Sequence, residues 1–123
     1  NDIRASRKIR KIVKEQAGKA NTADMENITL VMERGTKSLS VLDGKNLSEI
    51  VKYYVGNVHG GPKFSYDLEN IYSASRDGII TKFDVKTLSV ELRLKAGIYT
   101  RSIAVSPDND TVAVANQLPG NIV

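Results

Sequence analysis

The sequence contains no cysteine, a single histidine and no long hydrophobic run. Without cysteine the chain forms no disulfide, thiolate metal site or cysteine nucleophile, and it has no Cys-x-x-Cys-His motif for a covalent c-type haem. No apolar stretch approaches the roughly 18 residues of a membrane-spanning helix. With 123 residues, 41% of them hydrophobic and 26% charged, the chain has the size and composition of one globular domain.

The formal charge of +4 lies in the first part of the chain. Residues 1–20 hold seven basic and two acidic residues, or +5, whereas residues 21–123 hold 11 basic and 12 acidic residues, or −1. Because the remainder is close to neutral, we expect no nucleic-acid partner. The seven basic residues are Arg4, Arg7, Lys8, Arg10, Lys11, Lys14 and Lys19.

Apolar residues recur at helical spacing within this basic segment, which predicts an amphipathic helix over residues 3–17 that ends at Gly18. Residues 19–26 are polar and aperiodic, as in a linker. We therefore interpret residues 1–26 as a basic helical leader and linker. It is either a solvated tether or a segment that contacts an anionic membrane surface or a partner.

From Asn27 onward the pattern changes to short β-rich runs separated by turn residues. This spacing predicts an antiparallel all-β fold with no helix between the strands. The nine predicted strands are 28–32, 38–42, 50–55, 63–65, 71–75, 79–83, 89–94, 102–105 and 111–115.

The strands belong to an internal repeat with an offset of 41 residues, at which Leu30, Ile71 and Val112 coincide. A unit of about 40 residues with four short strands is typical of a β-propeller blade, which buries both faces against its neighbours. Residues 27–123 are therefore predicted to form the first two to three blades of a propeller. Because propellers close with roughly four to eight blades, we expect the chain to be the N-terminal portion of a longer protein, or one of three copies in a ring.

The segment 66–84, with the sequence Tyr-Asp-Leu-Glu-Asn-Ile-Tyr-Ser-Ala-Ser-Arg-Asp-Gly-Ile-Ile-Thr-Lys-Phe-Asp, resembles the repeat of the haem d1 propeller family. That family includes the cytochrome cd1 nitrite reductases and the NirF-like haem d1 maturation proteins. Three further features are similar to the family: the strand-turn-strand of residues 33–43, the Val-His pair at 58–59, and the segments 101–103 and 113–120. The resemblance covers about residues 27–123.

The resemblance implies an eight-bladed propeller that binds haem d1 in its central cavity. It makes Arg76 and Arg101 candidates for the tetrapyrrole carboxylates, Ser102 a further cofactor contact, and His59 the candidate iron ligand and catalytic residue. A guanidinium pairs bidentately with a carboxylate, and imidazole is a common iron ligand. The implied partners are haem d1 or its precursor and a c-type cytochrome as electron donor, in the periplasm. The sequence does not fix the oligomeric state, and a homodimer is one alternative.

The residues themselves leave other interpretations open. His59 is equally explained as a polar loop residue and Arg76 as a solvated turn residue, whereas Arg101 at the start of a cavity-lining strand needs an anion. The recurring aspartates Asp43, Asp67, Asp84 and Asp108, like the Asp77-Gly78 turn, are predicted to hold turns.

Three functions remain after the sequence has been considered. The protein is an NO-forming nitrite reductase, a NirF-like maturation protein, or a non-enzymatic propeller of the YVTN or WD-repeat type that acts as a binding scaffold. The sequence therefore leaves open whether it is an enzyme at all.

Overall fold

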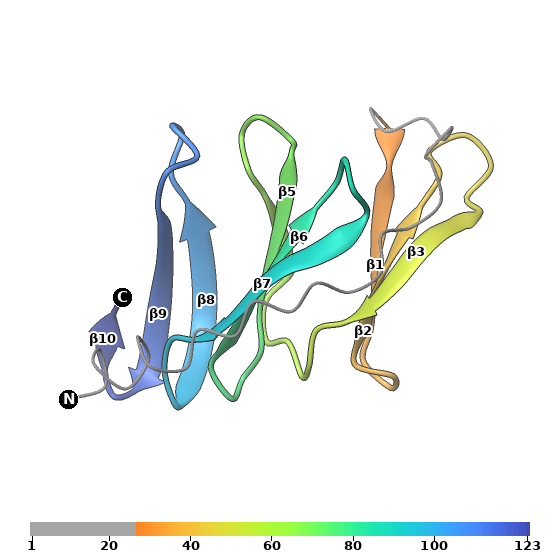
Figure 1. The fold of residues 1–123 in the computed structure, drawn as a ribbon. Coiled ribbons are helices and arrows are strands. Elements are labelled where there is room, and N and C mark those ends of the chain that lie inside the picture. The colour runs from red at the N-terminus through yellow and green to blue at the C-terminus, as the bar shows by residue number, and fades with distance from the viewer. Residues whose placement is uncertain (1–26) are drawn as a thin grey trace.

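In the computed structural model, which describes residues 27–123, ten β-strands form three antiparallel sheets (Figure 1). This confirms the predicted all-β fold. The predicted leader helix and linker lie outside the described residues. Among residues 27–123, no helix is long and apolar enough to cross a membrane. The strands are β1 (Thr29–Glu33), β2 (Ser38–Leu42), β3 (Glu49–Tyr54), β4 (Lys63–Phe64), β5 (Asn70–Ala74), β6 (Ile79–Asp84), β7 (Ser89–Lys95), β8 (Tyr99–Val105), β9 (Val112–Leu118) and β10 (Asn121–Ile122).

Each of the nine predicted strands has a counterpart, within one residue at each end in the first two sheets, and the larger differences concern the third sheet. Strand β8 begins at Tyr99 rather than Ser102, and β9 runs on to Leu118. Strand β10 lies outside the nine predicted strands, but it stands where the 41-residue repeat expects the counterpart of β6 to begin. It pairs with Asn116 and Ala115 and gives the end of β9 a partner.

The sheets have the orders β1-β2-β3, β4-β5-β6-β7 and β8-β9-β10, and they stand side by side with the β4–β7 sheet in the middle (Figure 1). Strands β1 and β2 recur 41 residues later as β5 and β6. By the same repeat, β4 and β8 are the first strands of their sheets, and these two strands contact each other. The three sheets are therefore successive propeller blades, as the repeat predicted.

The turns repeat with the same period as the strands. Positive φ angles occur at pairs of positions 41 residues apart: Lys37 and Gly78 with 56° and 86°, Leu47 and Leu88 with 59° and 53°, and Leu68 and Asn109 with 61° and 65°. Non-glycine residues rarely adopt this conformation. Its recurrence shows that the blade imposes the turn geometry even where the local residue disfavours it.

Aspartate side chains hold these turns, as predicted. Asp67 Oδ1 accepts hydrogen bonds from Ser65 Oγ at 2.5 Å and from the Glu69 N–H at 3.0 Å. The Asp108 turn repeats this arrangement with Ser106 Oγ at 2.5 Å and the Asp110 N–H at 3.1 Å. Asp43 and Asp84 likewise accept backbone N–H groups, at 2.7 and 2.8 Å. All four aspartates are therefore turn residues.

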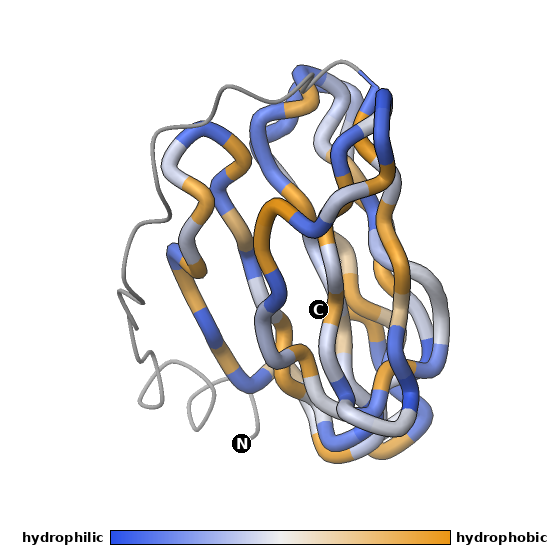
Figure 2. The backbone as a smooth tube through the Cα atoms, turned by 90° about the vertical axis from the view of Figure 1, so that its right-hand side faces the viewer, coloured by the Kyte–Doolittle hydropathy of each residue, from blue (hydrophilic) through white to orange (hydrophobic). Residues whose placement is uncertain are grey.

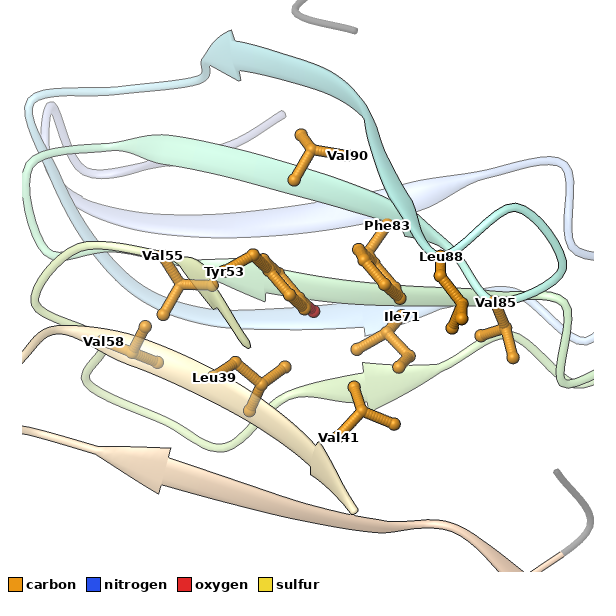
Figure 3. Close-up of a cluster of buried hydrophobic side chains, with 10 residues drawn as sticks. All are labelled: Leu39, Val41, Tyr53, Val55, Val58, Ile71, Phe83, Val85, Leu88 and Val90. Carbon is orange, nitrogen blue, oxygen red and sulfur yellow. The ribbon is translucent and has the colours of Figure 1, made fainter. Parts of the chain in front are cut away.

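A hydrophobic cluster joins the first two sheets. Figure 3 shows its side chains between β2–β3 on one side and β5–β7 on the other. At its centre Tyr53 stacks on Phe83, with parallel rings whose centroids are 4.2 Å apart. Burial of one such side chain stabilises the fold by about 1.5–3 kcal/mol. The cluster comprises Leu39, Val41, Tyr53, Val55, Val58, Ile71, Phe83, Val85, Leu88 and Val90.

A second cluster joins the middle sheet to the third, where Tyr72 and Ile80 pack with Ile103 and Val114. Along the strands, hydrophobic and hydrophilic residues alternate (Figure 2), because successive side chains point to opposite faces of a sheet. Both faces of the middle sheet therefore pack against a neighbouring sheet. Its first strand, β4, contacts β8, the first strand of the third sheet.

Candidate functional site

Two predicted site residues from different blades meet at one end of the sheets. His59 lies in the loop between β3 and β4, and Arg101 lies in β8. Arg101 Nη1 is 2.8 Å from His59 Nε2. Because a guanidinium only donates hydrogen bonds, Nε2 accepts and the ring hydrogen of the neutral imidazole is on Nδ1. The two residues therefore form one hydrogen-bonded unit.

Arg101 occupies a β-bulge. Thr100 pairs with Asn116 and Ser102 pairs with Ala115, so Arg101 has no partner opposite it in β9. A bulge inserts one extra residue into a strand and redirects its side chain, and such bulges are frequent beside functional sites. Because of the bulge, the exposed Arg101 side chain does not follow the alternating pattern of β8.

A buried polar network lies behind this bulge. Asn116 Oδ1 accepts a hydrogen bond from Thr100 Oγ1 at 2.6 Å, and Asn116 Nδ2 donates to the Ala96 carbonyl and to Asn121 Oδ1, each at 3.0 Å. Gly97 makes room for it, because a Cβ there would be 2.3 Å from Asn116 Oδ1. The network fixes the start of β8, and sequence reasoning missed it because its members come from separate turns and strands.

The turn between β5 and β6 places Arg76 in the same region. Its N–H donates to the Asn57 carbonyl at 2.8 Å, and its carbonyl accepts the Thr100 N–H at 3.0 Å. The Arg76 backbone thus ties the loop before β4 to the start of β8, while its side chain is exposed. The next two residues are structural, as predicted: Asp77 Oδ1 accepts from Ser75 Oγ, and Gly78 has φ 86°.

A hollow of about 70 Å³ lies between β4 and β8. Arg101 and Ser102 line it from β8, and Lys63 lines it from β4. Lys63 was not among the predicted site residues. The argument that selected Arg101, a cation at the start of a cavity-lining strand, applies equally to Lys63 and could have found it. The full lining is Gly60, Gly61, Lys63, Ala74, Arg101, Ser102 and Ile103.

The site is positively charged. Among residues 27–123, none of the salt bridges involves Lys63, Arg76 or Arg101; they are made by Lys52, Lys82 and Lys86. In the same range, no group of three or more His, Asp or Glu side chains could hold a metal ion. The arrangement therefore suits recognition of an anion, with a single imidazole beside it.

A larger cavity of about 370 Å³ lies between β3 and the β6–β7 hairpin. Asp77 and Thr81 line it, but the four predicted site residues do not. The structure thus brings Arg101 and Ser102 to the small hollow, sets His59 against Arg101, and places the Arg76 backbone against Thr100.

The comparisons with known proteins agree with the fold. The model of the family described as "Cytochrome D1 heme domain" matches residues 23–123. The chain is 43% identical over 104 residues to a dihydro-heme d1 dehydrogenase of Pseudomonas aeruginosa, covering 82% of this chain and 21% of that protein. It is 32% identical over 98 residues to a NirF protein of Stutzerimonas stutzeri, covering 78% of this chain and 25% of that protein.

Solved structures give the same result. The dihydro-heme d1 dehydrogenase NirN in complex with DHE matches with a TM-score of 0.79 and 42% identity, over 84% of this chain and 22% of that one. A Bacteroides fragilis protein described as a 6-phosphogluconolactonase matches with a TM-score of 0.60 and 15% identity over 76% of this chain and 30% of that one, which shows the fold alone. The chain spans about a fifth to a quarter of the length of the curated relatives it matches.

Proposed function

Because this chain belongs to the cytochrome D1 heme domain family, we propose that it supplies blades of a propeller that binds a haem d1-type tetrapyrrole through its carboxylates. We place the whole protein in haem d1 maturation, within the pathway that serves nitrite reduction. The observation that carries the proposal is a set of three cations that make no salt bridge within residues 27–123: Lys63 at the start of β4, Arg101 in β8 and Arg76 in the β5–β6 turn.

The residues that line the small hollow fit one carboxylate group of such a ligand. A hollow of about 70 Å³ is far too small for a macrocycle but accommodates a carboxylate group. Guanidinium groups hold carboxylates with short, charge-assisted hydrogen bonds. The macrocycle itself would then lie over β4 and β8, the first strands of their sheets, and other parts of the protein would complete its pocket.

We assign His59 to the iron side of the bound tetrapyrrole, as the candidate ligand and catalytic residue. In this structure the Nε2 lone pair accepts the Arg101 hydrogen bond at 2.8 Å. The same lone pair cannot bind iron at the same time, so ligation by Nε2 requires Arg101 to turn toward a ligand carboxylate. When bound, the haem supplies the redox chemistry of its iron, while Arg101 and His59 orient it.

The relatives support maturation over nitrite reduction, since they include a dihydro-heme d1 dehydrogenase at 43% identity and NirF proteins at 32% and 31%. Under this proposal the substrate is the dihydro form of haem d1, which gives up two electrons, one to each of two acceptor haems such as those of c-type cytochromes, and releases two protons to the solvent. The periplasm is the proposed compartment. The rival proposal, a scaffold propeller, leaves the unpaired cations without a role.

The test uses the full-length natural protein. Its visible spectrum is recorded as purified and after addition of haem d1 or the dihydro precursor, and acid acetone extraction then shows whether the chromophore is held non-covalently. Uptake of either tetrapyrrole supports the proposal, and a protein that takes up neither contradicts it. Incubation of the precursor complex with an artificial electron acceptor then separates the roles: loss of two hydrogen atoms by mass spectrometry indicates a dehydrogenase, and nitric oxide formation from nitrite indicates a reductase.

A further inference from the structure

The cavity of about 370 Å³ lies between the first two sheets, on the opposite face of the middle sheet from the small hollow. In β6, Ile80 packs toward the third sheet, whereas Phe83 belongs to the cluster shared with the first sheet. Because successive side chains alternate between faces, Thr81 points to the same side as Phe83, and it lines the cavity. The volume of this cavity is typical of small-molecule sites.

The Thr81 hydroxyl is buried in the wall of this cavity without a partner. Thr81 is 1% exposed, and among residues 27–123 its Oγ1 has no hydrogen-bond partner. A buried hydroxyl in this state lowers the stability of the fold, so its presence in a native structure needs an explanation. The space beside it supplies one, because a molecule that enters the cavity can form the missing hydrogen bond.

Two cations of β7 stand beside this hydroxyl. Arg93 pairs directly with Thr81 in the β6–β7 register. Lys95 is two residues further along β7, so it shares the face of Arg93, and both line the cavity. Arg93 Nη2 donates to the Tyr54 carbonyl of the first sheet at 2.6 Å, which holds the guanidinium at the cavity. Within residues 27–123, the Lys95 side chain makes no salt bridge and no hydrogen bond, so its ammonium group is available to an anion.

The remaining walls indicate which kind of anion fits. Among the described residues, Asp77 is the acidic member of the lining, and its Oδ1 accepts a hydrogen bond from Ser75 Oγ. Two cations therefore face one carboxylate, which leaves an excess of positive charge. Val55, which lies at the edge of the hydrophobic cluster in Figure 3, forms an apolar wall together with Ile79. A cavity that combines donors with an apolar wall suits a molecule that carries both kinds of group.

We propose that this cavity is a second binding site, which takes a small organic acid with an apolar body and one carboxylate. The carboxylate accepts hydrogen bonds from Lys95, Arg93 and the Thr81 hydroxyl, and the apolar body lies against Val55. Guanidinium and ammonium groups only donate, and a hydroxyl can donate, so a carboxylate matches all three. The site goes beyond the proposed function, because it binds a molecule separate from the tetrapyrrole.

The test uses the full-length protein and three fluorinated probes observed by fluorine NMR. Two probes are acids, para-fluorobenzoate and terminally trifluorinated hexanoate, and the third is the neutral para-fluorobenzamide. Each titration is made with the ligand-free protein and again after saturation with the tetrapyrrole. The variants are Lys95→Met, Lys95→Arg, Thr81→Val and Lys45→Met. Lys45 is the matched control, because it is an exposed lysine in the β2–β3 turn that does not line the cavity. Thermal midpoints verify that each variant is folded.

We expect both acids to bind, with an affinity that the tetrapyrrole does not change, and the amide to bind more weakly. Lys95→Met weakens binding of the acids about 10-fold or more, as expected for loss of a charge-assisted hydrogen bond. Lys95→Arg restores most of this affinity, and Lys45→Met leaves it unchanged. Thr81→Val has two opposed effects that a merely structural role would not give. It weakens binding of the acids several-fold, and it raises the thermal midpoint of the ligand-free protein because the unpartnered hydroxyl is gone.

The proposal is overturned if neither acid binds the unsubstituted protein at millimolar concentration, or if Lys95→Met or Thr81→Val binds the acids equally well. Equal affinity for the benzoate and the benzamide overturns the assignment of a carboxylate. Displacement of the acids by the tetrapyrrole overturns the separate site, because it shows that the cavity belongs to the tetrapyrrole. A failure of the proposed function is seen independently, as a protein that takes up no tetrapyrrole, and the acids are still titrated against its ligand-free form.

Discussion

The network around Asn116 predicts a large effect from a residue that does not line the hollow between β4 and β8. Asn116 is buried, with 7% of its surface exposed, and it makes three hydrogen bonds to Thr100, Ala96 and Asn121. Replacement of Asn116 by Ala removes all three. Thr100, which is 1% exposed, and the carbonyl of the buried Ala96 then lose these partners, whereas the partly exposed Asn121 can turn to water.

The magnitude follows from the two groups left without partners. A buried polar group without a hydrogen bond costs about 1–3 kcal/mol, so two of them predict a loss of about 2–6 kcal/mol of unfolding free energy. Because Thr100 is next to the Arg101 bulge, the same change is expected to weaken binding of the tetrapyrrole. We therefore expect Asn116 to act as a positioning residue for Arg101.

Urea unfolding of the full-length protein measures the stability, and spectral titration measures the affinity. The control is Gln117→Ala, an exposed position on the same strand, which should change neither. A double-mutant cycle of Asn116→Ala with Thr100→Val should show coupling of about 0.5–3 kcal/mol, as for directly bonded residues. A loss below about 1 kcal/mol in Asn116→Ala, with unchanged affinity, would refute the reasoning.

Four further changes test the fold. Phe83→Ala should lower the unfolding free energy, measured with urea, by about 3–5 kcal/mol, because Phe83 is 1% exposed and stacks on a tyrosine. Phe83→Leu should lower it by less, and equal losses in the two variants would show that the ring shape is unimportant. Thr81→Val should raise the unfolding free energy by about 1 kcal/mol, since the buried Thr81 hydroxyl has no partner among the described residues; a decrease would show that the hydroxyl binds something, such as a water in the adjoining cavity. Leu68→Asn should also stabilise, by up to about 1 kcal/mol, because Leu68 has φ 61° and is 57% exposed, and the equivalent turn of the third sheet already carries asparagine; a lower thermal midpoint would contradict this. Serine hydroxyls lower the pKa of Asp67 and of Asp108 below the ordinary value of 3.8. The two ionised carboxylates therefore stabilise the fold fully above that value, and this stabilisation is lost as the pH falls through the lower folded-state pKa. Asp67→Asn should make the unfolding free energy less dependent on pH in this acid range, and an unchanged pH dependence would count against the linkage.

The strands, the turns and the repeat were predictable because they depend on local chemistry. Alternation of apolar residues defines a strand, and the Ser-x-Asp turns hold themselves by bonds within a few residues, as in the turn at Asp67. The offset of 41 residues is visible in the sequence and recurs in the φ angles of the structure. Strand β10 lies where the repeat expects the counterpart of β6 to begin, and it pairs with β9.

By itself, then, the sequence determined the blade and its repetition, and also the residue types, arginine and histidine, that suit a carboxylate-bearing ligand. Only the tertiary structure decided which of them meet. His59 contacts Arg101 across 42 residues, Lys63 lines one hollow with Arg101 from a neighbouring blade, and a bulge leaves Arg101 without a partner in β9. These relations depend on how two sheets pack and in which register they pair. A one-residue shift in a strand reverses every side chain, and no local pattern specifies that packing.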